Sequence, residues 1–501
     1  MTERADACDV LVVGGGINGT GIARDAAGRG LSVVLCEQHD LAAHTSSAST
    51  KLIHGGLRYL EHFEFGLVRK ALEEREVLLA AAPHIIWPLR FVLPHEPHLR
   101  PAWMIRAGLF LYDHLARRRR LPGSETVDLR QHPAGAPLRR SDRQGFVYSD
   151  GWADDARLVV LNALDAHERG AQILTRTRCA RVVREHGAWT ATLIADGGDR
   201  RAIRARSVVN AAGPWVASFL DQATPVRARR AVRLVKGSHI VVPRLFDHPF
   251  AYIFQNLDRR IIFAIPYEHA FTLIGTTDVE YHGDPARAAI TAEEVTYLCE
   301  LASRYFAHTV TPAEVVFSFS GVRPLLEDES ADPMSVTRDY SLELEADGPA
   351  LLSVFGGKIT TYRRLAQDAL ARLMPLLGAK GAPWTHDAPL PGGDLPGGDW
   401  AAYRAGLARR HPNFAPTLLD RWSRSYGTRL SRMLGAATAE EELGEAVLPG
   451  LHAAEIRYLR RTEWARTAED ILWRRSKLGL HLPAGSAAVL DAWLARLPAD
   501  G

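Results

Sequence analysis

Short apolar runs alternate with helical patterns at the start of the chain. Residues 9–13 (DVLVV) predict a buried parallel strand, residues 17–30 a helix that ends at glycine, and residues 32–36 (SVVLC) a second strand. This order is that of a βαβ unit, so the sequence predicts an α/β fold with a parallel sheet. Helical spacing returns over residues 67–82, and Pro83 ends it.

Strands dominate the middle of the chain. Four are expected at residues 171–174, 179–183, 190–194 and 207–210. A second group alternates apolar with polar residues, which favours a mixed or antiparallel sheet with one open face. Its strands are expected at residues 233–242, 252–255, 260–265, 271–275 and 315–320. Residues 351–355 predict one more strand, and two glycines separate it from a helix over residues 359–373.

The last quarter of the chain has a different composition. Residues 381–399 are rich in Pro and Gly and predict a linker. Residues 400–501 are rich in Arg, Glu, Leu and Ala with helical spacing, for example over residues 455–478. They predict a small helical domain without evident chemistry, whose expected role is a packing or dimer surface.

Composition narrows the possible functions. A length of 501 residues predicts about three domains, and 47% hydrophobic with 24% charged residues excludes a disordered or collagen-like chain. The net charge of +3 is too small to indicate nucleic-acid binding. The four cysteines lie far apart without a CxxC pair, so neither a disulfide framework nor a metal site is expected. With no secretory signal and no 18-residue apolar stretch, we expect a cytosolic protein or one that lies on a membrane without crossing it.

The clearest chemical signature is the glycine motif between the first strand and the first helix. Gly14 permits a tight turn, Gly16 allows a pyrophosphate to approach the backbone, and Gly19 allows the helix to pack closely on the strand. The helix N-terminus offers N–H donors to phosphate. Glu37 follows the second strand, where its carboxylate can bind ribose hydroxyls. This context predicts a dinucleotide site rather than a purely structural turn.

The glycine motif alone does not separate NAD from FAD, and residues 45–59 (TSSASTKLIHGGLRY) narrow that choice. A run of hydroxyl side chains followed by a lysine and paired glycines suits a loop that surrounds a large polar cofactor. A flexible serine linker would continue into more Gly and Ser, whereas this run continues into His, Arg and Tyr.

Two later glycine junctions also follow strands. Residues 207–215 (SVVNAAGPW) suit backbone packed closely on a cofactor, and a plain turn gives the same pattern. Residues 355–361 (FGGKITT) are similar to part of a nucleoside-triphosphate loop, but Ile359 stands where Ser or Thr is needed and the first glycine is missing. Such a junction can instead direct a helix N-terminus at a flavin ring, where the helix dipole stabilises the anionic reduced form.

Taken together, the motifs resemble those of one family, the aerobic, membrane-associated, FAD-dependent glycerol-3-phosphate dehydrogenases. The wider superfamily of glycine and sarcosine oxidases and D-amino-acid dehydrogenases shares only the first motif strongly. The segments that carry the resemblance are GGGINGTGIARDAAGRG (14–30), TSSASTKLIHGGLRYLEHFEFGLV (45–68), DDARLV (154–159), KGSHIVVP (236–243), GTTDVEY (275–281), SGVRPL (320–325), FGGKITTYR (355–363) and LWRR (472–475).

The resemblance implies the fold class. We expect a Rossmann-like FAD-binding domain of the glutathione-reductase or D-amino-acid-oxidase type, a mixed-sheet substrate domain and an α-helical C-terminal domain. The expected division is residues 1–95, 150–232 and 321–385 for the discontinuous FAD-binding domain, 96–149 and 233–320 for the substrate-binding (cap) domain, and 386–501 for the helical domain.

FAD is expected to be bound without a covalent link, and no metal is expected. The groups expected to contact FAD belong to the three glycine junctions, the acid after the second strand and the hydroxyl-rich loop. They are Gly14, Gly16, Ile17, Asn18, Gly19, Glu37, Thr45, Ser46, Ser47, Ser49, Lys51, Leu52, His54, Gly55, Gly56, Ala212, Gly213, Trp215, Gly357, Lys358, Ile359 and Thr360.

A phosphorylated substrate agrees with the charged residues of these motifs. A phosphomonoester carries close to two negative charges, so its pocket should hold several donors, preferably Arg. Four cations stand beside a glycine turn or a strand end, where side chains can converge, although the surface is the more common place for any single arginine: Arg58, Arg260, Arg323 and Lys358. The resemblance implies the same substrate-binding set with three additions, Tyr59, His239 and Thr360.

The expected reaction is the oxidation of sn-glycerol 3-phosphate to dihydroxyacetone phosphate. Hydride passes from C2 to flavin N5, and a base removes the C2 hydroxyl proton. Histidine is the natural base near neutral pH, and we favour His239 over His54, with a structural role as the alternative for each. Lys358 with a lowered pKa is a rival base. Arg323 is expected to steady the developing alkoxide.

The electrons must then leave the flavin. The resemblance implies a peripheral enzyme on the cytoplasmic face of the cell membrane that passes electrons to quinone. Residues 99–121 combine a short apolar stretch with several arginines, so we expect this segment to dock on an anionic membrane surface. A core helix followed by a solvated charge run is the alternative. A homodimer is also expected.

Three other functions stay open on the sequence. A glycerol-3-phosphate oxidase would pass its electrons to O₂, and that choice depends on access to the flavin. A related FAD-dependent amine or hydroxy-acid dehydrogenase is disfavoured by the basic pocket and by residues 236–243. A non-catalytic, flavin-holding membrane adaptor would bind a partner through its C-terminal helices, and the intact pocket residues argue against it.

Overall fold

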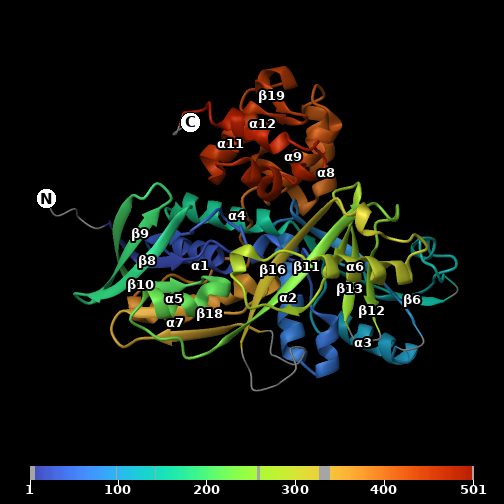
Figure 1. Ribbon diagram of the computed structural model, residues 1–501, viewed down its shortest axis with the longest axis horizontal. Helices are drawn as coiled ribbons and strands as arrows, with labels where there is room; N and C mark the ends of the chain where they lie inside the picture. The colour runs from blue at the N-terminus through green and yellow to red at the C-terminus, as the bar shows by residue number, and fades with distance from the viewer. Residues whose placement is uncertain (1–5, 97–98, 142, 257–259, 327–338, 499–501) are drawn as a thin grey trace.

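The computed structural model describes residues 6–96, 99–141, 143–256, 260–326 and 339–498 (Figure 1). Two sheets occupy the N-terminal and middle parts of the chain, and the C-terminal helices lie above helix α4 (Asp155–Glu168) in the view of Figure 1. The predicted α/β fold, with a mixed second sheet and a helical C-terminal region, is confirmed.

The first sheet contains the predicted βαβ unit. Its strand order is β17-β18-β10-β1-β2-β7, parallel except at β17, and the hairpin β8–β9 extends from β10. The strands are β1 (Asp6–Val13), β2 (Val33–Cys36), β7 (Gln172–Leu174), β8 (Thr177–Glu185), β9 (Ala188–Ala195), β10 (Arg200–Asn210), β17 (Ser341–Glu345) and β18 (Ala350–Phe355).

Helices cover both faces of this sheet, which explains why β1 is apolar without alternation. Val10 and Val12 pack in the cluster with α1 (Ile17–Gly28), α4 and α7 (Tyr362–Leu377). Leu11 and Val13 pack in the cluster with α5 (Val216–Ala223) and the β8–β9 hairpin. Helix α1 contacts both α4 and α7, so the first helix of the chain is central to its layer.

The second sheet is mixed, in the order β15-β11-β14-β13-β12-β4-β6-β3, with β16 paired to β11 and β5 to β6. Strand β12 is parallel to β4, and the other pairs are antiparallel. The strands are β3 (Leu52–Ile53), β4 (Ile86–Pro94), β5 (Glu125–Asp128), β6 (Gln144–Ala153), β11 (Val232–Pro243), β12 (Ala251–Gln255), β13 (Ile261–Tyr267), β14 (Phe271–Gly275), β15 (Val279–Glu280) and β16 (Phe317–Leu326).

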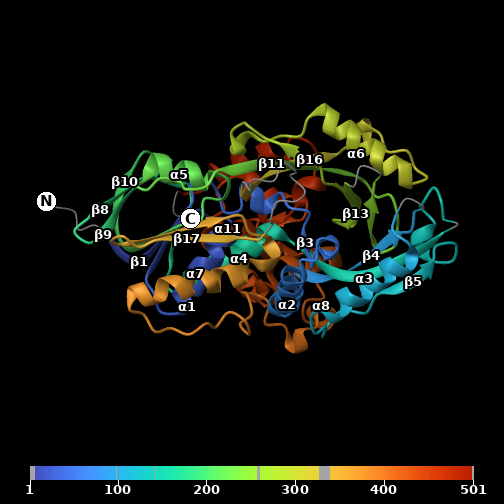
Figure 2. The same ribbon diagram turned by 90° about the horizontal axis from the view of Figure 1, so that it is seen from below.

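The expectation of one open face on this sheet is wrong. Figure 2 shows α6 (Ala292–Tyr305) on one side and α2 (Phe65–Ala81) with α3 (Ala102–His114) on the other. Ile240 packs with the α6 side and its neighbour Val241 with the α2 and α3 side, so successive residues of β11 are buried on opposite faces. Apolar and polar residues alternate along these strands, and that pattern did not reveal that helices cover both faces of the sheet.

Several strands of the second sheet were not predicted. Strand β3 has only two residues, and β4 contains two prolines, so neither carries a clear strand pattern. Both belong to the second sheet, although the expected division placed residues 1–95 with the FAD-binding domain. Strand β6 crosses the expected boundary at residue 150. The strand pairing therefore places β3, β4 and all of β6 in the second sheet, whereas the expected domain boundaries assign β3, β4 and part of β6 to the FAD-binding domain.

The C-terminal helices have a hydrophobic core of their own. A small hairpin, β19 (Ala446–Leu448) with β20 (Leu451–His452), was not predicted. The expected helical stretch 455–478 is broken at Trp464, a left-handed residue, and is followed by the π-helix η11 (Asp470–Arg475). The other helices are α8 (Trp400–Arg410), α9 (Pro416–Tyr426), α10 (Leu430–Leu434), α11 (Ala453–Glu463) and α12 (Ser486–Leu494).

Candidate functional site

A cavity of about 440 Å³ lies where the strands of the first sheet end. Val13 at the end of β1, Cys36 at the end of β2 and Ala211 just after β10 all line it. Ligands of open parallel sheets bind outside the carboxyl ends of the strands, where connections diverge. The cavity therefore lies where the glycine motif predicts a dinucleotide.

The glycine motif forms one wall of this cavity. Gly14 has a φ of 110°, and a Cβ there would lie 2.5 Å from the Ala211 carbonyl oxygen. A Cβ on Gly19 would lie 1.9 Å from the Gly14 carbonyl oxygen. Only glycine fits such contacts, so the turn and close-packing roles predicted for these two positions agree with the structure.

Polar groups surround the N-terminus of α1. The Ile17 N–H donates to Ser46 Oγ at 3.0 Å, and the Asn18 amide donates to the Gly356 carbonyl at 3.1 Å. Glu37 accepts from the Gly15 N–H at 2.6 Å, and burial raises the pKa of its carboxyl. Glu37 and Asn18 both line the cavity. The contact of Glu37 with a ribose stays a prediction.

Half of the residues expected to contact FAD line this cavity: Gly14, Gly16, Ile17, Asn18, Glu37, Thr45, Ser46, Ala212, Gly213, Trp215 and Gly357. The other half do not line the cavity but follow lining residues closely along the chain: Gly19, Ser47, Ser49, Lys51, Leu52, His54, Gly55, Gly56, Lys358, Ile359 and Thr360. Sequence reasoning missed several lining residues of the β8 strand and of the chain after β2, among them Arg178, Cys179 and His44, because none stands in a recognisable motif.

Lys51 is buried in an ion pair. Its Nζ lies 2.7 Å from Asp155 Oδ1 and donates to the Ser47 carbonyl at 3.0 Å. Burial lowers the pKa of Lys51, while Asp155 opposes that shift. Ser49 Oγ donates to the same carboxylate at 2.8 Å. The turn over residues 47–51 is thus folded around Asp155 at the start of α4, a partner that the sequence analysis did not identify.

His239 on β11 lies next to this turn. Its Nε2 is 3.0 Å from Thr50 Oγ1, and its ring stacks on Phe319 of β16 at 4.9 Å between centroids. Nδ1 is buried and has no hydrogen-bond partner among the described residues. Burial, followed by the charges of Lys51 and Arg323, lowers the pKa of His239 to about 3. We call His239, Thr50, Lys51, Phe319 and Asp155 the His239 cluster.

The segment over residues 50–54 connects this cluster to the Gly356–Gly357 junction. Thr50 contacts His239, and the His54 N–H donates to Thr360 Oγ1 at 3.2 Å. Lys358 Nζ lies 3.9 Å from the centroid of the Tyr59 ring. Arg58 precedes Tyr59 in the 3₁₀ turn η2 (Leu57–His62). The structure therefore brings together the expected residues of the hydroxyl-rich loop and those of the third junction.

Arg323 and Arg260 lie on other parts of the second sheet. Arg323 on β16 forms an ion pair with Asp278 and donates to the Thr277 carbonyl at 3.4 Å. The next residue, Pro324, lines the cavity. Arg260 precedes β13, and its guanidinium lies 5.5 Å from the centroid of the Tyr297 ring on α6.

Within the described ranges, no group of three or more His, Cys, Asp or Glu side chains could hold a metal ion. No helix in the part of the chain that the structure describes is long and apolar enough to cross a membrane.

Comparisons with known proteins agree on one family. Residues 9–363 match the family described as FAD dependent oxidoreductase, and residues 383–497 match the C-terminal domain of alpha-glycerophosphate oxidase. The chain is 56% identical to a glycerol-3-phosphate dehydrogenase of Pseudomonas aeruginosa over 98% of this chain and 95% of that protein. It is 50% identical to the aerobic glycerol-3-phosphate dehydrogenase of Escherichia coli, over 97% of each.

Other similar proteins extend the comparison. A D-erythritol 1-phosphate dehydrogenase of Brucella abortus is 51% identical over 97% of this chain and 98% of its own length. Among solved structures, the glycerol-3-phosphate dehydrogenase from Bacillus halodurans complexed with FAD is 27% identical, with a TM-score of 0.79. The match covers 99% of this chain and 91% of that one.

The residues of the cavity fit FAD. Gly16 leaves its backbone open to a pyrophosphate, because the nearest atom to a Cβ there would be Ser46 Oγ, 3.1 Å away. Asn18 Oδ1 is buried without a hydrogen-bond partner among the described residues, so an acceptor is left for the ligand. On these grounds and on the family match, FAD is the cofactor, and the chain belongs to the FAD-dependent glycerol-3-phosphate dehydrogenase family.

Proposed function

We propose that this enzyme oxidises sn-glycerol 3-phosphate to dihydroxyacetone phosphate. The observation that carries the proposal is that two cationic residues each stand next in the chain to a residue that lines the FAD cavity. Lys358 follows the lining residue Gly357, and Arg323 precedes the lining residue Pro324. A Cβ on Gly356 would lie 3.7 Å from the Pro324 carbonyl oxygen, so the two segments are in contact. Two cations on adjoining segments suit the dianion of a phosphomonoester.

The remaining expected residues have complementary roles in this proposal. Lys358 and Arg323 bind the phosphate, assisted by Arg58 and Arg260, while Tyr59 and Thr360 orient the substrate. Arg323 is paired with the partly exposed Asp278, so the phosphate competes with that carboxylate for the guanidinium. A dianion binds more strongly than a single carboxylate, which favours the exchange.

His239 is the base in this proposal. At neutral pH its ring is uncharged, because its pKa is lowered to about 3. Burial is the larger cause of this shift, and a bound phosphate dianion offsets the smaller contributions of Lys51 and Arg323, so it raises the pKa and makes His239 a better base. When bound, FAD accepts the hydride from C2 of the substrate. His239 then holds the proton of the C2 hydroxyl, and Arg323 steadies the developing negative charge.

An anaerobic absorbance titration tests the reaction. We expect sn-glycerol 3-phosphate to bleach the oxidised-flavin band, and a quinone analogue to restore it without O₂. Restoration by O₂ alone would identify an oxidase. Bleaching by D-erythritol 1-phosphate in preference to glycerol 3-phosphate would assign the other substrate found among the relatives. Bleaching by an amino acid alone would overturn the phosphate pocket, and an unbleached flavin would favour the non-catalytic adaptor.

A matched pair of lysine variants tests the pocket. Lys358→Met removes a charged donor, which is expected to lower kcat/KM about ten- to a hundredfold. Lys380→Met is the control, because Lys380 is exposed and away from the cavity. Equal activities for the two variants would contradict the assignment of Lys358.

The proposal includes electron transfer to quinone at the cytoplasmic face of the cell membrane. Support comes from three exposed aromatic side chains on neighbouring elements: Phe63 after η2 is 78% exposed, and Trp103 and Phe110 on α3 are 70% and 57% exposed. Arginines at positions 117, 119 and 120 are exposed in the same docking segment. Exposed aromatic residues beside cations suit the boundary between lipid headgroups and acyl chains.

Sedimentation with anionic liposomes tests this docking. We expect Trp103→Ser with Phe110→Ser to weaken binding at all salt concentrations, and serines at residues 117–120 to weaken it mainly at low salt. Val489→Ser on α12 is the control, because Val489 is 54% exposed on the C-terminal domain. Unchanged binding in the first two variants would reject the segment over residues 99–121.

Two further features belong to the proposal. FAD is bound without a covalent link, so acid precipitation should leave the flavin in the supernatant. The enzyme is a homodimer, which light scattering of the purified holoenzyme tests directly.

A further inference from the structure

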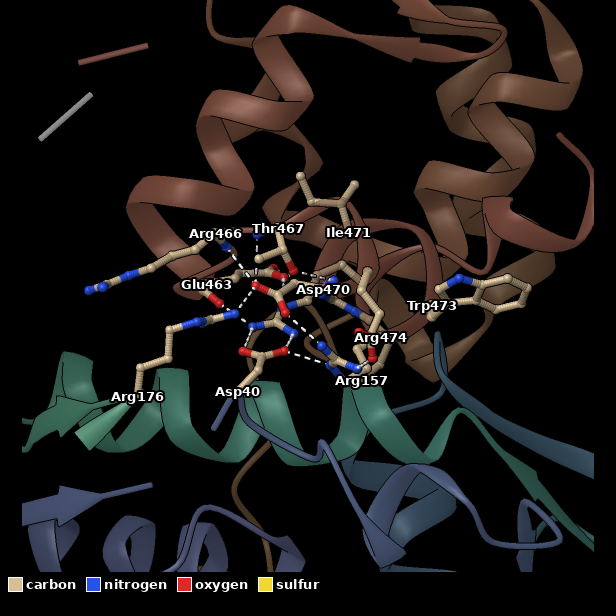
Figure 3. A network of polar contacts seen from close by, with 12 residues as sticks. Asp40, Arg157, Arg176, Glu463, Arg466, Thr467, Asp470, Ile471, Trp473 and Arg474 are labelled. Atoms are coloured by element: carbon tan, nitrogen blue, oxygen red, sulfur yellow. Dashed lines mark hydrogen bonds and ion pairs between the residues drawn. The ribbon is translucent and has the colours of Figure 1, made fainter. Parts of the chain in front are cut away.

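The C-terminal domain reaches a loop of the FAD site through buried charges (Figure 3). We call residues 37–47, between β2 and the end of the 3₁₀ turn η1 (Thr45–Ser47), the cofactor loop. Asp40 lies in this loop and accepts from Arg474 Nε at 2.7 Å and Arg475 Nη1 at 2.6 Å. Arg475 Nη2 donates to the second carboxylate oxygen at 2.8 Å. Both arginines belong to the π-helix η11.

These arginines are also held in place by contacts within their own domain. Arg475 is fully buried and also donates to the Glu463 carbonyl at 2.6 Å. Arg474 donates to Asp470 at 2.6 Å. Asp470 is fixed in turn by the Arg466 N–H at 2.7 Å. The two guanidinium groups are therefore pre-organised to meet a carboxylate at one place.

A second connection joins the same two elements. Arg176 Nη2 lies 2.7 Å from Asp470, and the Arg176 N–H donates to the His39 carbonyl of the cofactor loop at 2.8 Å. Figure 3 shows Asp40 and Arg176 both directed from the FAD-binding domain towards η11. The outer side of the cofactor loop is thus attached to η11 directly at Asp40 and indirectly at His39, through Arg176.

The inner side of the cofactor loop faces the cavity. Seven of its residues line the cavity, whereas Asp40 does not: Glu37, Gln38, Ala42, Ala43, His44, Thr45 and Ser46. Only the short turn η1 gives this loop regular structure, so ordering it costs conformational entropy. A shift of the loop would take Asp40 away from both of its cations and leave each buried arginine with fewer carboxylate contacts, which is unfavourable.

We propose that Arg474 and Arg475 are positioning residues for FAD, which hold the cofactor loop, through Asp40, in the conformation that lines the cavity. The C-terminal domain is then part of the cofactor site and not only a packing surface. The proposal rests on FAD being the cofactor and is independent of which alcohol phosphate is oxidised.

The test is the rate of FAD release from the purified holoenzyme, followed by flavin fluorescence after dilution. If Asp40→Asn leaves the loop in its cavity-lining conformation about a tenth of the time, the apparent Kd for FAD rises about tenfold. Such changes in affinity fall mainly on the dissociation rate, so we expect release to be about tenfold faster. Hydrogen exchange of residues 37–47 should rise in the same variant. Release at the wild-type rate from folded D40N protein would overturn the proposal.

A second variant covers the case in which Asp40→Asn does not fold. Arg474→Gln leaves both contacts of Arg475 with Asp40 in place, so we expect a smaller increase in FAD release. Arg474→Lys keeps a cation and should restore part of the retention. Equal release from the wild type and both Arg474 variants would contradict the role of this arginine.

Two control variants separate loop positioning from domain docking. Arg424→Gln removes the hydrogen bonds that α9 of the C-terminal domain donates to the Pro83 and His84 carbonyls, outside the cofactor loop and the Asp40 network. Glu168→Gln breaks a more exposed pair with Arg429 and Arg432. We expect both to lower Tm without a marked change in FAD release. If Arg424→Gln or Glu168→Gln accelerates release as much as Asp40→Asn, docking of the whole domain is responsible and the proposal fails.

Discussion

The FAD cavity and the neighbouring His239 cluster are built in different ways. The wall of the cavity is mostly backbone and small side chains, with contacts that exclude even a Cβ at Gly14 and Gly19. The His239 cluster consists of buried polar, charged and aromatic side chains from separate segments. The first therefore depends on steric fit, whereas the second depends on charge balance. Substitutions in the two regions should fail for different reasons.

The largest effect on stability is expected in the His239 cluster. Lys51→Met leaves Asp155 buried without its cation, and breaking a buried pair in this way costs about 3–5 kcal/mol. The measurement is urea unfolding of the holoenzyme. Arg69→Met is the control, because Arg69 forms an exposed pair with Glu73 worth at most about 0.5 kcal/mol. A loss below about 1 kcal/mol in Lys51→Met would mean that Ser49 and the Ala156 N–H satisfy Asp155 alone.

Next to the cavity wall, the sharpest steric test is Gly19→Ala. The added methyl would lie 1.9 Å from the Gly14 carbonyl oxygen, so α1 must move away from the end of β1. Overpacking of this kind costs about 1–3 kcal/mol. We also expect a lower ratio of flavin to protein after purification. Gly66→Ala is the control, because among the described residues a Cβ at Gly66 in α2 would meet no atom within 4 Å beyond its chain neighbours and its own helix backbone. Full flavin occupancy in Gly19→Ala would contradict the steric account.

This difference also explains what the sequence could reveal. The cavity wall follows from a short local motif, because Gly14, Gly16 and Gly19 lie within one strand, turn and helix. The His239 cluster requires strand register: His239 stands opposite Phe319 only through the pairing of β11 with β16. Lys51 and Asp155 are 104 residues apart. Residue types indicated that these positions mattered, but not which partner each would have.

The C-terminal domain shows the same limit more strongly. Its helical character followed from composition and spacing, yet its contact with the FAD site depends on Asp40 and two arginines more than 430 residues later. No periodic pattern links such distant residues. The π-helix that presents the arginines has no sequence signature in the helical pattern either. The buried ion pairs of Asp40 with Arg474 and Arg475 connect the C-terminal domain to the FAD site, although the sequence of that domain contains no recognisable motif.

A smaller effect is expected from pH. The pKa of His239 is lowered to about 3 in the folded protein and is near 6.5 in the unfolded chain. The unfolded chain therefore binds the proton first, so stability is full above about pH 6.5 and falls as the pH drops towards 3. At about 1.4 kcal/mol per pKa unit, His239 should account for about 2 kcal/mol of lost stability between pH 7 and pH 5.

Urea unfolding of wild type and His239→Gln at pH 7 and pH 5 measures the contribution of His239 to this loss of stability. The variant should lose about 2 kcal/mol less than the wild type over the same interval. His84 is the internal comparison, because it is fully buried and its pKa is also lowered to about 3, so part of the acid sensitivity must persist in the variant. Parallel losses in the two proteins would show that His239 is not the buried neutral group in question.

The smallest effect is expected where a side chain of the cofactor loop contacts the backbone at the start of α1. Ser46 lies in the cofactor loop, and its Oγ accepts from the Ile17 N–H at 3.0 Å, so it caps α1 from a distant segment. Gly16 at the N-cap position has no side chain for this task. Ser46→Ala should therefore cost about 1 kcal/mol. Ser47→Ala in the same turn is the control, because among the residues that the structure describes its Oγ donates only to the nearby His44 carbonyl, at 3.3 Å. A larger loss in Ser47→Ala would mean that the turn itself, rather than the cap, fixes the cofactor loop against α1.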